Sequence, residues 1–191
     1  MQIVEKRQAL KIPPVLRLAF RPLFLLGSLL ALLAIPFWVH AWLGAVGSWQ
    51  PVGGWLAWHR HELVFGFAGA IIAGFLLTAV QNWTGRPSLS GKPLAALVVV
   101  WLGARLSWLL GVPVWLLMPL NLLFVLLVAV VMARLLWAVR QKNNYPVVAI
   151  LLLLLAADAQ YLTGLAVENQ DWQRRAVLAA VWLVAAMMTL I

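Results

Sequence analysis

The sequence predicts an all-α fold: a polytopic membrane helical bundle with six transmembrane helices and both termini in the cytoplasm. Of the 191 residues, 65% are hydrophobic and only 10% are charged, whereas soluble domains carry about 25% charged residues. The apolar residues gather into stretches that are long enough to cross a bilayer, which takes roughly 20 residues. The basic residues occupy alternate connections between these stretches. This composition excludes a water-soluble globular enzyme and a disordered or nucleic-acid-coating chain.

Six apolar stretches give the expected spans, which follow a basic amino-terminal segment over residues 1–22. The spans lie near residues 23–43, 62–80, 93–111, 114–138, 146–167 and 172–191. The first stretch is longer than the 7–15 apolar residues of a cleaved signal peptide, so we interpret it as a span. Because the six spans leave little chain outside the membrane, we expect residues 1–191 to form a single membrane domain.

The distribution of the net charge of +9 predicts the orientation of the chain. Ten basic residues lie before the first span or beside the second and fourth connections, and three, Arg60, Arg174 and Arg175, lie at the opposite ends of the spans. The positive-inside rule therefore places both termini in the cytoplasm. A nucleic-acid-binding surface would not follow alternate loops, so we expect the basic residues to contact the lipid bilayer and no nucleic acid.

The chain has no cysteine, so a bound metal would need His, Met or carboxylate ligands. All three histidines, His40, His59 and His61, fall at the expected outer ends of the first two spans. Together with Glu62 and Asp158 they form a set that fits a transition metal or the iron of a haem. The alternative is that His40 and His59 are boundary residues whose polar tips lie among the lipid headgroups.

One face of the second span carries the small residues Gly66, Ala70 and Gly74 at four-residue spacing. On a regular α-helix, His59, Glu62 and Gly66 share this face, which we expect to pack against a neighbouring helix. His61 falls about 200° away from His59, so the two rings would not bind one ion from a regular helix.

Arg105 and Asp158 are ionisable residues inside apolar spans, where such groups are costly and usually functional. They follow Pro93 and Pro146, respectively, by the same number of residues, and both spans run outward, so the two side chains share a depth. We therefore predict a buried ion pair between Arg105 and Asp158. With Glu62, the same residues also fit a polar pathway for an anion or a proton, which makes a transport or permeation bundle the alternative function.

Two motifs in the first half of the chain point to a known family. The first is Trp58–Glu62, with the pattern Trp-His-x-His-Glu, and the second is the inner-loop motif after the second span. The inner-loop motif consists of Asn82, Trp83, Thr84, Gly85 and Arg86. Shorter matches occur at Phe20–Phe24, Leu89–Leu94 and Trp101–Arg105. With these motifs the chain resembles the NnrS family, and beyond Arg105 the resemblance is mainly one of hydropathy.

The resemblance implies a multi-pass protein of the bacterial inner (plasma) membrane that contains haem and copper and is linked to the response to nitric oxide and nitrosative stress. It makes His59 and His61 the leading candidates for haem or copper ligation, with His40 as a further cofactor-binding candidate and Glu62 as a group that orients a ligand. No established catalytic turnover comes with the resemblance, and the sequence identifies no catalytic residue.

Members of the family look longer, with a second group of spans that carries further histidines. This chain therefore resembles an amino-terminal half. We expect its partner to be a second six-helix half or another membrane subunit, which would contribute further ligands to a shared centre.

Overall fold

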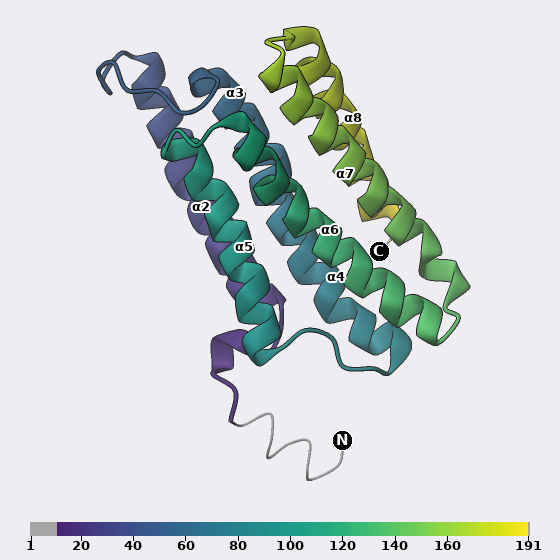
Figure 1. The fold of residues 1–191 in the computed structure, drawn as a ribbon. Helices are drawn as coiled ribbons and strands as arrows, with labels where there is room; N and C mark the ends of the chain where they lie inside the picture. The colour runs from purple at the N-terminus through teal and green to yellow at the C-terminus, as the bar shows by residue number, and fades with distance from the viewer. Residues whose placement is uncertain (1–10, 191) are drawn as a thin grey trace.

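The computed structural model describes residues 11–190, and these residues form helices joined by short connections, without a β-strand. Figure 1 shows the long helices side by side as a bundle. In chain order the elements are the 3₁₀-helix η1 (Pro14–Leu16), α2 (Phe20–Trp42), α3 (Gly54–His61), the π-helix η2 (Glu62–Ala68), α4 (Gly69–Thr84), α5 (Gly91–Leu109), α6 (Val114–Ala138), the 3₁₀-helix η3 (Lys142–Asn144), α7 (Tyr145–Ala166) and α8 (Gln170–Leu190).

Six helical segments within residues 11–190 are long and apolar enough to cross a membrane, which confirms the predicted fold class. The second of them is a continuous rod of 31 residues, Gly54–Thr84, built from α3, η2 and α4. It begins before the expected start at residue 62. The reason is local: Gly53 adopts a left-handed conformation with φ of 70°, which turns the chain into the helix directly after it. The polar motif around His59 therefore lies within the rod.

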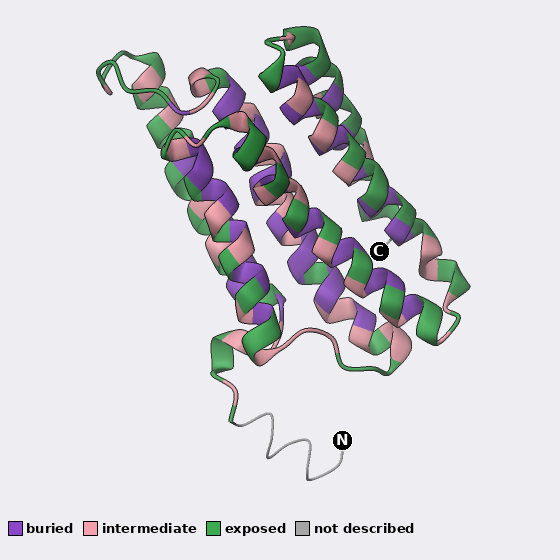
Figure 2. Cartoon of the chain, viewed as in Figure 1, coloured by how far each residue is buried: buried purple, intermediate pink, exposed green. Residues whose placement is uncertain are grey.

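The long helices pack around α4 and α6: α2 packs on α4, α5 packs on α6, and α8 packs on α7. The central pair is α4 and α6, with α2 and α5 on one side and α7 and α8 on the other, and α6 packs directly on α7. Buried residues line the inward faces of the helices, whereas exposed residues cover the outward faces (Figure 2). Because many of these exposed residues are large and apolar, the outward faces suit contact with lipid.

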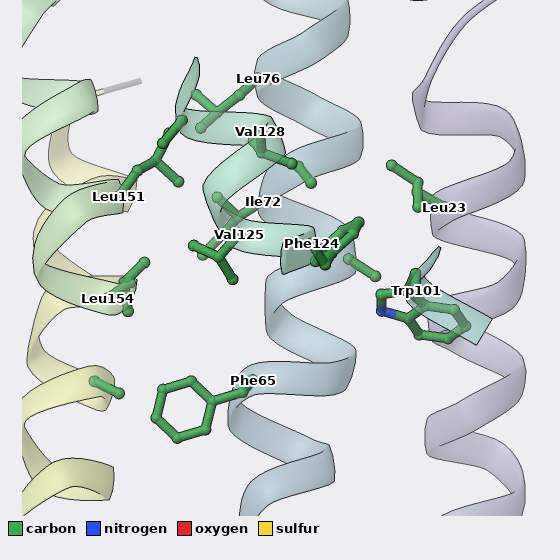
Figure 3. Close-up of a cluster of buried hydrophobic side chains, with 14 of the residues drawn as sticks. Leu23, Phe65, Ile72, Leu76, Trp101, Phe124, Val125, Val128, Leu151 and Leu154 are labelled. Atoms are coloured by element: carbon green, nitrogen blue, oxygen red, sulfur yellow. The ribbon is translucent and has the colours of Figure 1, made fainter. Parts of the chain in front are cut away.

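Large apolar side chains fill the space between the central helices and α7 (Figure 3). The cluster includes Ile72 and Leu76 of α4, Phe124, Val125 and Val128 of α6, and Leu151 and Leu154 of α7.

Small residues let α2 approach α4, as the sequence predicts for one face of the second span. A Cβ atom built on Gly74 would lie 2.9 Å from Cδ1 of Phe24, and one on Gly27 would lie 3.3 Å from the Cβ of Ala70. Close approach through small residues is a common way to pack helices in lipid.

Candidate functional site

The middle of the second span is a π-helix, η2, and this changes which side chains face inward. A π-helix has wider turns than an α-helix, so face assignments made at 100° per residue fail across it. His61, expected opposite Glu62, is instead buried together with it. The indole of Trp101 on α5 donates a hydrogen bond to the carbonyl of Gly66 at 3.2 Å, which supports the irregular backbone. Segments of this kind occur frequently at functional sites.

Four ionisable side chains form one continuous network beside η2. The Nδ1 atom of His61 lies 3.2 Å from Oε1 of Glu62, and its Nε2 atom lies 2.9 Å from Oδ1 of Asp158. The Nε atom of Arg105 lies 2.8 Å from Oε2 of Glu62. The exposed fractions are 0% for His61 and Glu62, 1% for Asp158 and 8% for Arg105. The network therefore joins the second span to α5 and α7 in the interior of the bundle.

Asn121 of α6 extends the network, and sequence reasoning missed it. Its side-chain oxygen accepts a hydrogen bond from Nη2 of Arg105 and another, at 3.4 Å, from the indole of Trp108. Its amide nitrogen donates to the carbonyl of Leu117 at 2.8 Å, which fixes the orientation of the group. The available signal was a buried polar residue within an otherwise apolar stretch of span.

Aromatic side chains surround the imidazole of His61. Ring centroids of Trp108, Phe65 and Tyr161 lie 4.6, 5.1 and 5.4 Å from that of His61. Tyr161 also donates a hydrogen bond of 2.7 Å to the carbonyl of Ala57, which ties α7 to α3. Such an enclosure excludes water and strengthens the ionic contacts inside it.

The contacts of His61 define its protonation. A carboxylate oxygen only accepts hydrogen bonds, so each ring nitrogen must carry a proton to bond its carboxylate. With Glu62 and Asp158 both ionised, two such bonds make His61 the imidazolium cation. The cations of His61 and Arg105 then balance the anions of Glu62 and Asp158. An unbalanced charge at this depth would carry a large desolvation cost.

The direct ion pair expected between Arg105 and Asp158 does not form among the described residues, and this corrects the expectation. Both side chains are buried at the site, but Arg105 contacts Glu62 and Asp158 contacts His61. His61 and Glu62 are adjacent in the second span, are both fully buried and lie between the two residues. Both residues therefore belong to one buried network, but each has another partner than the one expected.

His59 lies outside the network. Its ring stacks on the indole of Trp38, with the centroids 4.2 Å apart and the planes 16° apart. Both the Nδ1 atom of His59 and the indole nitrogen of Trp38 are buried without a hydrogen-bond partner among the described residues. His59 thus offers a desolvated ring nitrogen with no protein partner.

His40 is exposed on α2, and its Nδ1 atom lies 2.9 Å from the carbonyl oxygen of Pro36. It lies on an apolar groove of about 550 Å³ that Phe37 and Trp58 also line. The three histidines therefore do not converge on one point. Within residues 11–190, no group of three or more His, Asp or Glu side chains is arranged to hold a metal ion.

The inner-loop motif lies at the opposite end of the rod from His59 and ends α4. Gly85 has a φ of 65° and donates its N–H to the carbonyl of Gln81, which is the usual way for a glycine to terminate a helix. Thr84 bonds back to the carbonyl of Val80 at 2.7 Å and accepts a bond from the N–H of Arg86 at 3.2 Å. These contacts give the motif a structural role.

Fold and site together define a polytopic helical membrane protein with a charge-balanced network buried beside a π-helix. The family model described as NnrS protein matches residues 14–191. The chain therefore belongs to the NnrS family, and the match continues well beyond Arg105 through the remaining spans. No curated protein and no solved structure matches the chain.

Proposed function

We propose that this chain is a haem- and copper-binding protein of the bacterial inner membrane that acts in the response to nitric oxide and nitrosative stress. Family membership supports the proposal. The observation that carries it is the buried Nδ1 atom of His59, which has no hydrogen-bond partner. In the proposed topology both termini lie in the cytoplasm, since the basic residues favour that side.

The imidazole of His59 is suited to act as a metal ligand. A buried polar atom without a partner is costly, and native proteins retain few of them. Imidazole nitrogen is a common ligand of copper and of haem iron. The stack on Trp38 holds the ring in one orientation before any metal arrives. When bound, copper or haem iron would supply an open coordination position for a diatomic molecule.

His40 would be suited to hold the iron of a haem. A metal-ligating imidazole usually donates its second N–H to a carbonyl or carboxylate, and Nδ1 of His40 lies at hydrogen-bond distance from the Pro36 carbonyl. That bond leaves Nε2 free at the edge of an apolar groove. Haem is a large apolar plane, so such a groove suits it.

His61 is not available as a metal ligand in the observed arrangement, because the carboxylates of Glu62 and Asp158 contact both of its ring nitrogens. We assign it, with Glu62, a positioning role: the network fixes the helix turn that carries His59. One nitrogen from His59 and one from His40 do not complete a coordination sphere. The remaining ligands come, in this proposal, from a second six-helix half or another membrane subunit.

Absorption spectroscopy and metal analysis of the detergent-purified protein test this function. We expect a Soret band and bound copper, with the Soret band reduced in His40→Ala and the copper content reduced in His59→Ala. Trp115→Ala, which removes an exposed aromatic residue of α6, serves as a control that keeps both the Soret band and the bound copper. A preparation free of haem and copper in the wild type would contradict the proposal.

The second candidate is a transport bundle, favoured by the network that links Arg105, Glu62, His61 and Asp158 through the interior. A metal-free protein that moves protons or anions into liposomes, and loses this activity in Glu62→Gln, would support it instead.

A further inference from the structure

A second apolar groove lies between α2 and α8. Its floor is the outward face of η2, with Leu63, Val64 and Phe67, and its walls include Ile35 of α2 and Val181 of α8. The groove has a volume of about 330 Å³. It is distinct from the groove beside His40 and from the buried network on the inward side of the rod.

Arg60 lies on α3, four residues before Val64 of the groove floor. About one helical turn separates Arg60 from Val64, so Arg60 lies toward the α3 end of the groove. The side chain is half-buried, and it forms no hydrogen bond or ion pair with another described residue. A half-buried guanidinium of this kind lacks the anion that would balance it.

Arg174 of α8 lies toward the same end of the groove as Arg60. It shares one stripe of α8 with Val177, Val181 and Val184, at spacings of three and four residues. Val181 and Val184 line the groove, whereas Arg174 is exposed near the start of the helix, where α8 packs against α3. It forms no ion pair with a described residue. Two arginines therefore lie toward the α3 end of an apolar groove, and neither forms an ion pair with an acidic residue in the described part of the chain.

We propose that this groove binds an anionic phospholipid of the bilayer, with an acyl chain against Phe67 and Val184 and the phosphate held by Arg60 and Arg174. Guanidinium groups bind phosphate oxygens through paired charge-assisted hydrogen bonds. The distance along α8 from Arg174 to Val184 is about 15 Å at 1.5 Å per residue. This distance matches the hydrocarbon thickness of one leaflet, because the hydrocarbon core of both leaflets together is about 30 Å thick. The proposal goes beyond the metal chemistry and needs no cofactor.

Net charge favours an anionic lipid over a zwitterionic one. The headgroup of phosphatidylcholine carries its own cation beside the phosphate, which competes with the arginines. Phosphatidylglycerol lacks that cation, so both guanidinium charges act on its phosphate. An apolar groove alone would bind either lipid, and the two arginines provide the discrimination.

Native mass spectrometry of the full chain in detergent tests the proposal, with phosphatidylglycerol and phosphatidylcholine added as separate probes. We expect a retained phosphatidylglycerol adduct and a weaker phosphatidylcholine adduct. Arg174→Gln and Arg60→Gln should each weaken phosphatidylglycerol binding about tenfold, the scale of one lost charge-assisted bond. Arg175→Gln removes the same charge one residue away and off the stripe, so it should bind like the wild type.

A second variant tests the apolar part of the groove. Val181→Trp fills it from α8 and should weaken both lipids while keeping the helical circular dichroism of the wild type. Equal binding of the two lipids, or equal losses in Arg174→Gln and Arg175→Gln, would overturn the proposal. It would also be overturned if Arg174→Gln removed a Soret band or converted a dimer to a monomer, because the groove would then hold haem or a second copy of the chain.

Discussion

The Oδ1 atom of Asp158 lies 2.9 Å from the Nε2 atom of His61, although 97 residues separate the two in sequence. This contact joins α7 to the second span at the point where that span becomes a π-helix. It also completes the pair of carboxylates that hold the His61 ring. The stability of the bundle should therefore depend on charge balance at a few buried atoms.

Asp158→Asn removes one anion and leaves the buried network with an excess positive charge. We expect a loss of roughly 3–5 kcal/mol in the free energy of unfolding, the cost of breaking a buried ion pair by removing one partner. Unfolding in mixed detergent and SDS, followed by circular dichroism, measures the change. Glu168→Gln, at an exposed position, neutralises a carboxylate outside the network and should cost little.

Glu62 and Arg105 should show strong energetic coupling, because their contact is buried and ionic. Glu62→Gln and Arg105→Met should each destabilise the protein. The double variant should be more stable than the sum of the two losses by about 1–3 kcal/mol, since it removes both charges together. Additive losses in this double-mutant cycle would show that the pair is not coupled.

Gly66 provides the space in which Arg105 reaches Glu62. A Cβ atom at this position would lie 3.0 Å from Nη1 of Arg105 and 3.1 Å from Oε2 of Glu62. Gly66→Ala should therefore cost roughly 1–3 kcal/mol through overpacking. Gly69→Ala is the matched control three residues further along, where a Cβ would meet nothing within 4 Å. It should leave stability unchanged or raise it by up to about 1 kcal/mol.

The Tyr161 hydroxyl connects α7 to α3 through the Ala57 carbonyl. Tyr161→Phe keeps the ring and removes this hydrogen bond, so we expect a loss of about 1–2 kcal/mol in the free energy of unfolding. Tyr145→Phe changes a partly buried tyrosine on the same helix without such a bond and should change stability less. Equal effects of the two substitutions would argue against a role for this bond.

Hydropathy predicted the six membrane-spanning helices, because it acts along the chain and needs no knowledge of packing. The six spans follow from apolar length, and the depth of Arg105 and Asp158 follows from position within a span. The partners of these residues could not be predicted in the same way. They depend on how α5 and α7 pack against the second span, which brings Arg105 to Glu62 and Asp158 to His61.

Two further features of the site depend on tertiary contacts. Asn121 belongs to the site because α5 packs on α6 and brings Arg105 and Trp108 to its side-chain oxygen. The different surroundings of His59 and His61 follow from which neighbouring helix each ring meets. The Trp-His-x-His-Glu motif identifies both residues as notable, but it does not distinguish a nitrogen without a partner from one held by a carboxylate.

The central claim is that His61 is an imidazolium that supports the site, whereas His59 is the nitrogen available to a metal. Solid-state ¹⁵N NMR of histidine-labelled protein in lipid, before and after copper addition, tests it most directly, with His61→Asn used to assign the signals. We predict that both ring nitrogens of His61 carry protons in each sample, while copper changes the His59 signals. A His61 ring that loses a proton when copper binds would contradict the account.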